Sequence, residues 1–261
     1  MLQLNKIYNE DCMETLNRME DCVIDLTITS PPYNVDLGNN KYNKNPYDLY
    51  NDNLEHKEYI SWLKTIFSKI YDKTKPGGRC VINVGDGKNG KIPTHSDIIQ
   101  FMVNDIGFLP FTIIIWNKNN TSNRTAWGSF KSPSSPSFPR NFEYLLVFSK
   151  EYNKLQWKGE TDLTKQEFID CSLGQWSFTG EKAKKVKHPA PFPMELPNRC
   201  LKMFSWVDSL VYDPFIGSGT TAISCILNDR RYIGSEISSE YCEVAEQRIL
   251  DFEKLISEST F

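Results

Sequence analysis

Short apolar runs separated by turn residues recur along this chain and predict strands that alternate with helices. One run ends at Asp213 and is followed by glycines, by a helix over residues 220–227 and by a strand that begins at Arg231. Another run, the β-branched segment 23–29, is typical of a buried strand, and an amphipathic helix over about residues 56–71 comes after it. This alternation predicts an α/β fold with a Rossmann-like, doubly wound and mostly parallel sheet.

The remaining pattern adds elements to this sheet. Strands are expected over residues 7–12, 79–84, 111–116 and 143–148, and the last two can pair as a long antiparallel hairpin. Helices are expected over about residues 13–19, 96–104, 164–171 and 194–204. Prolines at positions 133, 136 and 139 exclude regular structure between residues 119 and 140. A chain of 261 residues favours one domain with a small appendage.

The turn after Asp213 has the chemistry of a nucleotide-binding loop. Gly217 and Gly219 allow a sharp turn and a close approach of the backbone to a ligand, and the helix that follows presents unpaired N–H groups. Glu236 comes at the end of the next strand, where its carboxylate can accept hydrogen bonds from both hydroxyls of a ribose. The spacing from Gly217 to Ala222 also fits the dinucleotide fingerprint, so a NAD or FAD site and a plain helix-start turn both stay open.

A second candidate site, Ser30-Pro31-Pro32-Tyr33, stands directly after the strand 23–29. The two prolines fix the backbone and remove two N–H donors, so carbonyl acceptors are held beside a hydroxyl and an aromatic ring. Such a group suits the exocyclic amino group of a planar base. The Ser30 oxygen and a proline carbonyl can accept its two hydrogens while Tyr33 stacks on the ring, although a plain Pro-Pro loop is the alternative.

Taken together, the tetrapeptide Ser30 to Tyr33 and the segment Asp213-Pro-Phe-Ile-Gly-Ser-Gly-Thr-Thr221 resemble the motifs of amino-directed DNA methyltransferases that use S-adenosyl-L-methionine. Their order is that of the permuted β group, whose members belong to restriction-modification systems. The resemblance makes Ser30, Pro31, Pro32 and Tyr33 the catalytic residues. It assigns S-adenosyl-L-methionine binding to Asp11, Cys12, Ser30, His188, Phe192, Asp213, Pro214, Phe215, Gly217, Ser218, Gly219, Thr220, Thr221 and Glu236. For Asp11, a role in the first turn of a helix is the alternative.

The formal net charge of −3 gives no general argument for nucleic-acid binding, which therefore has to rest on local patches. Residues 117–140 contain four basic residues and no acid. The resemblance and this patch place DNA contacts at Asn34, Lys118, Arg124, Trp127, Ser129, Lys131, Ser132 and Arg140. A solvated basic loop is the alternative. The segment 34–53 is expected to be a lid or a substrate clamp.

The resemblance divides the chain into a catalytic half over residues 1–118, a DNA-facing loop, hairpin strand and target-recognition segment over 119–187, and a cofactor-binding half over 188–261. Serine at the first position of the tetrapeptide leans in this family towards cytosine N4. We therefore expect a sequence-specific DNA methyltransferase that acts on cytosine N4 of a flipped base, with adenine N6 as the alternative and a dinucleotide-dependent oxidoreductase as a more remote one. Methylation of cytosine C5 is rejected because none of the seven cysteines follows a proline.

Several expectations concern partners and location. The scattered cysteines indicate neither a disulfide framework nor a zinc site, and no metal is expected. No signal peptide and no membrane-spanning run is visible, so we expect a cytoplasmic protein without a membrane partner. Double-stranded DNA is the expected substrate. The resemblance adds a homodimer and a cognate restriction endonuclease that acts on the same site.

Overall fold

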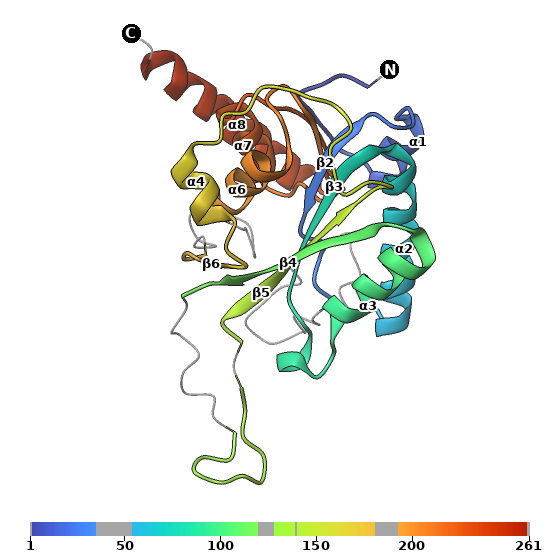
Figure 1. Ribbon diagram of the computed structural model, residues 1–261, viewed down its shortest axis with the longest axis vertical. Helices are drawn as coiled ribbons and strands as arrows, with labels where there is room; N and C mark the ends of the chain where they lie inside the picture. The colour runs from blue at the N-terminus through green and yellow to red at the C-terminus, as the bar shows by residue number, and fades with distance from the viewer. Residues whose placement is uncertain (1, 35–53, 120–127, 139, 181–192, 260–261) are drawn as a thin grey trace.

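The computed structural model describes residues 2–34, 54–119, 128–138, 140–180 and 193–259. Within these ranges, eight strands form one sheet in the order β1-β8-β7-β2-β3-β5-β4-β6 (Figure 1). The strands are β1 (Lys6–Tyr8), β2 (Ile24–Thr29), β3 (Thr74–Val84), β4 (Leu109–Asn117), β5 (Phe142–Ser149), β6 (Gln175–Ser177), β7 (Leu210–Asp213) and β8 (Arg231–Ser235).

The strand pairing confirms the predicted fold class. Strand β5 runs antiparallel to both of its neighbours, β3 and β4, and the other neighbouring pairs are parallel. The expected hairpin is the β4–β5 pair. The three segments expected from the sequence, 1–118, 119–187 and 188–261, all contribute strands to this sheet, and their division of labour stays a prediction.

Helices cover both faces of the sheet, as a doubly wound fold requires. One face packs on α1 (Cys12–Arg18), α2 (His56–Lys73), α3 (Thr94–Gln100) and the π-helical turn η2 (Phe101–Ile106). The other face packs on α6 (Glu195–Phe204), α7 (Thr220–Leu227) and α8 (Ser239–Ser259), and α4 (Lys165–Cys171) packs against α6 (Figure 1). A short 3₁₀ turn, η1 (Lys88–Gly90), follows β3.

Side chains alternate between the two cores along each central strand. On β3, Cys80 and Ile82 face the α2 side and Val81 faces the α6 side. On β5, Leu146 faces the α2 side and Leu145 the opposite core. This period of two explains why these runs are almost continuously apolar, because a strand buried on both faces has no solvent side.

The structure corrects several expected boundaries. β1 ends at Tyr8 because Asp11 is already the N-cap of α1. β3 begins at Thr74, which already pairs with Ile24 of β2, and the register shifts before Arg79 pairs with Leu26. The single helix expected over residues 96–104 is α3 followed by η2. The pattern indicated neither β6 nor α8.

Two further features bear on the expectations above. All seven cysteines are free thiols, and six of them are buried. Among the helices of the described residues, none combines the length and the hydropathy that a membrane span requires.

The topology determines where a site can form. Strands β1, β8, β7 and β2 are parallel neighbours, so their carboxyl ends meet at one edge of the sheet. The chain continues from β2 into α2 on one face, and from β7 into α7 on the other. This reversal between adjacent strands opens a crevice at the edge, where ligands bind in open α/β sheets.

Candidate active site

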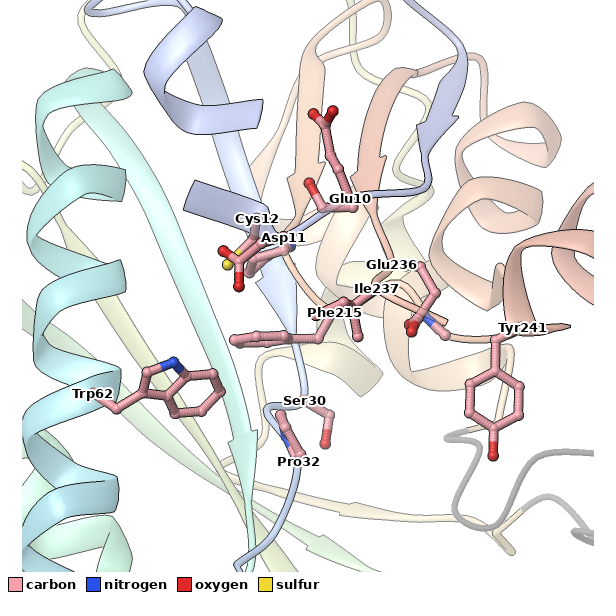
Figure 2. A pocket seen from close by; sticks show the side chains of 13 residues that line it. Glu10, Asp11, Cys12, Ser30, Pro32, Trp62, Phe215, Glu236, Ile237 and Tyr241 are labelled. Atoms are coloured by element: carbon pink, nitrogen blue, oxygen red, sulfur yellow. The ribbon is translucent and has the colours of Figure 1, made fainter. Parts of the chain in front are cut away.

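A cavity of about 200 Å³ lies at the edge where β1, β2, β7 and β8 end (Figure 2). Each of these four strands contributes the residues that follow it, and α2 and α8 add one side chain each. The lining residues are Glu10, Asp11, Cys12, Ser30, Pro32, Trp62, Pro214, Phe215, Gly217, Ser235, Glu236, Ile237 and Tyr241. The cavity therefore joins the tetrapeptide and the glycine loop, which are remote in the sequence.

Three acidic residues, Glu10, Asp11 and Glu236, line the cavity, and none of the described lining residues is a lysine or an arginine. The Glu10 carboxylate is paired with Arg18, so the charges left to face a ligand are those of Asp11 and Glu236. A pyrophosphate would meet these two carboxylates, whereas a cation or a set of hydroxyl and amino donors would be favoured. The cavity thus fits a nucleoside with a positive centre better than it fits a dinucleotide.

Glu236 is held by the glycine loop. Its Oε2 accepts a hydrogen bond from the Gly217 amide at 3.0 Å, and its Oε1 accepts one from the Ser238 amide at 2.9 Å. Burial raises the pKa of the Glu236 carboxyl above its ordinary value, and these amide donors act in the opposite direction. Each oxygen keeps a lone pair, so the carboxylate can accept further donors from a ligand.

Asp11 has a structural role as well as a place in the wall. Its side chain caps α1 by accepting a hydrogen bond from the Met13 amide at 2.8 Å. The helix-start alternative for Asp11 therefore holds, and the residue lines the cavity at the same time. Beside it, the buried Cys12 thiol has a raised pKa because burial disfavours the thiolate.

The rest of the lining is largely apolar. Figure 2 shows Trp62 projecting from α2 towards Phe215, and their ring centroids are 5.5 Å apart. Ile237 and Tyr241 complete the apolar lining. Planar heterocycles bind well against such surfaces. Sequence reasoning missed Trp62, Ile237 and Tyr241, together with Glu10 and Ser235.

Asp213 lies behind the cavity and organises its loops. It is buried, and its Oδ1 accepts hydrogen bonds from Thr29 Oγ1 at 2.9 Å and from the Phe215 amide at 3.1 Å. Its Oδ2 accepts from Thr221 Oγ1 at 2.6 Å. Burial raises the pKa of Asp213 to about 6, against the effect of these donors. The carboxylate thus faces the protein, and neither Asp213 nor Thr221 is a lining residue.

Three more residues of the glycine loop face α8. Gly219 has a φ of 81°, and a Cβ placed on it would lie 2.9 Å from the Cβ of Ala245. Arg248 donates to Ser218 Oγ at 2.9 Å and to Thr220 Oγ1 at 3.4 Å. The glycine at 219 is therefore required by the backbone conformation and by helix packing, whereas Gly217, Pro214 and Phe215 reach the cavity.

The tetrapeptide is tied into a polar network. Ser30 Oγ donates to Tyr33 Oη at 3.0 Å, and Tyr33 Oη donates to Glu143 Oε2 at 3.1 Å. Asn83 Nδ2 donates to Glu143 Oε2 at 2.8 Å and to Tyr33 Oη at 3.0 Å. The Lys118 ammonium pairs with Glu143 Oε1. Of the prolines, Pro32 lines the cavity and Pro31 is buried.

Two of the residues expected to contact DNA are ion-paired inside the protein. Lys118 pairs with the buried Glu143. Arg140 pairs with Asp86, whose other oxygen lies 2.7 Å from Nδ1 of His95. A lysine and an arginine held by buried carboxylates are poorly available to phosphates, because binding DNA would leave those carboxylates unpaired.

The connection between β4 and β5 carries the other described candidates. Its tip, residues 128–138, lies far from the sheet (Figure 1). Ser129 and Ser132 are used within this turn, where Ser129 Oγ donates to the Ser132 carbonyl at 2.9 Å and Ser132 Oγ to Ser134 Oγ at 3.0 Å. Lys131 is exposed, with its ammonium 5.4 Å from the centre of the Phe130 ring.

Asn34 is hydrogen-bonded to Leu54, the next described residue along the chain. Its Nδ2 donates to the Leu54 carbonyl at 2.6 Å, and the Leu54 amide donates to its Oδ1 at 2.9 Å. Four expected site residues, His188, Phe192, Arg124 and Trp127, lie outside the described residues, as does the expected lid 34–53 apart from Asn34.

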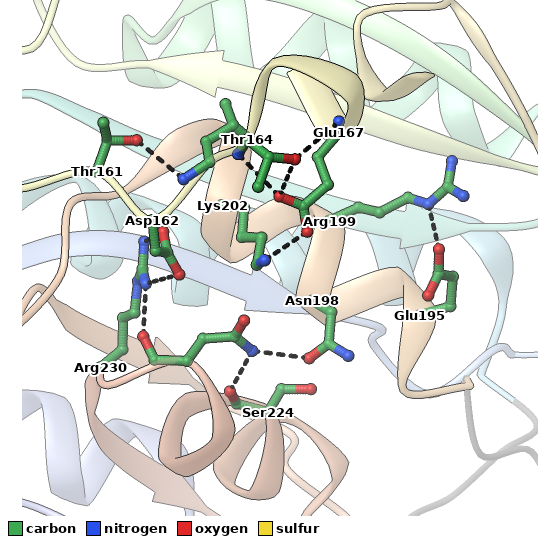
Figure 3. Close-up of polar contacts among 12 residues, drawn as sticks. Thr161, Asp162, Thr164, Glu167, Glu195, Asn198, Arg199, Lys202, Ser224 and Arg230 are labelled. Carbon is green, nitrogen blue, oxygen red and sulfur yellow. Dashed lines mark hydrogen bonds and ion pairs between the residues drawn. The ribbon is translucent and has the colours of Figure 1, made fainter. Parts of the chain in front are cut away.

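A second cavity, of about 430 Å³, lies between α4, α6 and the end of α7. Figure 3 shows that its polar wall is paired internally: Lys202 with Glu167 at 2.5 Å, and Arg199 with Glu195 at 2.7 Å. Asn228 donates to Asn198 at 2.9 Å. Because these charges are already paired, they offer little to a ligand. The Lys202–Glu167 pair links α6 to α4.

Comparison with known proteins agrees with this geometry. A model of the DNA methylase family matches residues 24–247. The type II methyltransferase M.MjaVI of Methanocaldococcus jannaschii is 41% identical over 62% of this chain and 80% of its own. The orphan methyltransferase M.BamHII of Bacillus amyloliquefaciens is 30% identical over 89% of this chain and 91% of its own. The structure of a DNA modification methylase from Thermus thermophilus complexed with S-adenosyl-L-methionine has a TM-score of 0.74 and 26% identity, covering 95% of this chain and 93% of that one.

The doubly wound sheet and the cavity at its carboxyl edge define an α/β protein with a ligand site at the topological switch point. More particularly, the chain belongs to the family of S-adenosyl-L-methionine-dependent DNA amino-methyltransferases. The family and the cofactor expected from the sequence are confirmed. No observation supports the oxidoreductase alternative.

Proposed function

We propose that this chain methylates the exocyclic N4 of a cytosine at a specific sequence in duplex DNA. The observation that carries the proposal is the position of Ser30, which lines the cavity together with Phe215 and Glu236 (Figure 2). An amino group held by Ser30 would lie beside whatever occupies the cavity. This proximity is the main requirement of an in-line methyl transfer.

The residues of the tetrapeptide would position the nucleophile. S-adenosyl-L-methionine, when bound, supplies an electrophilic methyl group. The amino nitrogen of the base is a poor nucleophile because its lone pair is delocalised into the ring. Ser30 Oγ and the Pro31 carbonyl would accept its two hydrogens and direct the lone pair towards the cavity. The base has to leave the duplex, and stacking on Tyr33 would replace part of the lost stacking.

The cavity residues fit the cofactor. Glu236 would accept hydrogen bonds from the ribose hydroxyls, and Asp11 would accept one from the adenine amino group. The apolar wall of Phe215, Trp62 and Ile237 would cover the adenine ring. The carboxylates of Asp11 and Glu236, with no lysine or arginine among the described lining residues, would favour the sulfonium charge.

The choice of cytosine N4 over adenine N6 rests on the uncharged Ser30 at the position where a carboxylate is the stronger acceptor. A homodimer, a cognate endonuclease and a cytoplasmic location belong to the same proposal. The words "type II" and "orphan" in the names of M.MjaVI and M.BamHII are compatible with an enzyme that has or lacks such an endonuclease.

The test is incubation of the purified protein with S-adenosyl-L-methionine and mixed-sequence duplex DNA, followed by digestion to nucleosides and mass spectrometry. Authentic N4-methyl and C5-methyl deoxycytidine standards are needed because these nucleosides have the same mass. N4-methylcytosine supports the proposal. N6-methyladenine keeps the reaction and overturns the base assignment, and the absence of any methylated nucleoside contradicts the function.

A further inference from the structure

We propose that Glu143 is a positioning residue that makes the Ser30 hydroxyl an obligate hydrogen-bond acceptor for the target amino group. The inference rests on the proposed function and deepens it. Glu143 acts through Tyr33 and does not touch the base. Its carboxylate lies at the buried end of the chain of hydroxyl groups Ser30–Tyr33–Glu143.

The direction of each hydrogen bond follows from the carboxylate. An ionised carboxylate only accepts, so the single proton of the Tyr33 hydroxyl is donated to Glu143 Oε2. The Tyr33 oxygen must then act as acceptor towards its other neighbours, Asn83 Nδ2 and Ser30 Oγ. The proton of Ser30 is consequently donated to Tyr33, and the Ser30 oxygen presents lone pairs to the cavity. Burial and Glu143 raise the pKa of Tyr33 well above its ordinary value, which keeps its hydroxyl protonated.

Asn83 supports the same polarity. Its amide nitrogen faces Glu143 Oε2 and Tyr33 Oη, while its Oδ1 is buried without a hydrogen-bond partner among the described residues. Leaving a buried carbonyl oxygen unpaired costs about 1–3 kcal/mol. The opposite orientation would direct Oδ1 at the carboxylate and cost more. The charge on Glu143 therefore fixes the amide.

Lys118 holds the other oxygen of the carboxylate. Its ammonium pairs with Glu143 Oε1, so the carboxylate is compensated although only 9% of the side chain is exposed. Burial of an unpaired carboxylate would be strongly unfavourable. The buried charge of Glu143 thus acts on the uncharged Ser30 through two hydrogen bonds.

Glu143→Gln tests this relay. The Lys118 ammonium needs an acceptor, so the glutamine would turn its oxygen towards Lys118 and its NH₂ towards Tyr33. The hydrogen bonds would then reverse: the glutamine would donate to Tyr33 and Tyr33 would donate to Ser30. The Ser30 proton would point at the amino group of the base. We expect the single-turnover methyl-transfer rate to fall by about 10- to 100-fold. The Kd for S-adenosyl-L-methionine, measured by calorimetry, should change by less than about twofold.

Tyr33→Phe and the double variant complete the experiment. Phenylalanine keeps the ring and removes the hydroxyl that links Ser30 to Glu143. If Glu143 acts through this link, adding Glu143→Gln to Tyr33→Phe costs nothing further, whereas independent roles would multiply the two losses. Should Glu143→Gln fail to fold, Tyr33→Phe decides alone: a wild-type rate contradicts the relay.

The matched control is Asp105→Asn, which removes the carboxylate of an exposed lysine pair with Lys64, 2.7 Å apart. It should transfer at the wild-type rate. A wild-type rate for Glu143→Gln, or multiplied losses in the double variant, would overturn the relay while leaving the function intact. A wild-type protein that methylates nothing would remove the function and the relay together.

Discussion

The Thr29 hydroxyl donates a hydrogen bond to the Asp213 carboxylate across 2.9 Å, and this contact joins the carboxyl ends of β2 and β7. Thr29 precedes the catalytic tetrapeptide and Asp213 precedes the cofactor loop. This buried hydrogen bond therefore ties the two halves of the site together where their strands pair.

Asp213 gives a pH dependence of known sign. Its pKa is raised by burial from 3.8 to about 6, so the folded protein binds a proton more tightly than the unfolded chain. The proton on Asp213 therefore stabilises the folded protein, by about 3 kcal/mol below about pH 4. This stabilisation is lost as the pH rises through about 6. Urea unfolding of the wild type and of Asp213→Asn measures it. The free energy of unfolding of the wild type minus that of the variant should fall between pH 4 and pH 7, and a constant or rising difference contradicts the assignment.

Glu236→Gln should weaken cofactor binding. The substitution removes the charge and leaves one oxygen to serve the Gly217 and Ser238 amides and the ribose. We expect the Kd for S-adenosyl-L-methionine to rise by about tenfold, corresponding to about 1.4 kcal/mol. Calorimetric titration measures this change. Glu240→Gln on the exposed start of α8 is the matched control and should bind like the wild type.

Ser30→Ala should separate binding from transfer. Loss of the hydroxyl removes an acceptor for the base amino group and leaves Asp11, Glu236 and the apolar wall in place. The transfer rate should fall by about 10²- to 10³-fold with cofactor affinity retained. Single-turnover kinetics and calorimetry on the same preparation decide. An unchanged transfer rate, or a loss of cofactor binding, would contradict the role assigned to Ser30.

Gly219→Ala should destabilise the fold. The added Cβ would sit at a φ of 81° and 2.9 Å from the Cβ of Ala245. We expect a loss of about 2 kcal/mol or more in the free energy of unfolding. Adding Ala245→Gly should restore the steric part only. Gly174→Ala has open space around its Cβ and should stay within about 0.5 kcal/mol of the wild type.

Lys131→Gln should weaken DNA binding through charge. Lys131 is exposed and belongs to residues 128–138 of the β4–β5 connection, and we expect one phosphate contact from it. The slope of log Kd against log salt should fall by about 0.9. Fluorescence anisotropy over a salt series measures the slope. Lys254→Gln, at the far end of α8, is the control, and an unchanged slope for Lys131→Gln would remove this contact.

Local signals predicted much of the fold. The periodic apolar face of α2, with Tyr59, Leu63 and Phe67, is buried as expected. Strand β6 could not be predicted because three residues carry no usable period, and its existence depends on pairing with β4. The register jump at the start of β3 likewise depends on its partner β2.

Within the site, the sequence predicted that each of the two motifs follows a strand. The parallel pairing of these strands, β2 and β7, brings the motifs together. The partners of charged side chains were not predictable, because Lys118 and Arg140 meet carboxylates from distant segments, at Glu143 and Asp86. Two signals were available and unused. Trp62 stands off the buried stripe of α2, and Asn83 is a polar residue inside an apolar strand.

Strand β7 is inserted between β2 and β8, although it is made long after β2. Asp25 Oδ2 accepts from the Leu210 amide at 2.7 Å at one end of this seam, and Thr29 donates to Asp213 at the other. During translation, β2 and β3 can pair early, but one edge of β2 stays open until residue 213 has left the ribosome. The nascent chain is therefore an incomplete sheet without an assembled site until β7 pairs with both β2 and β8.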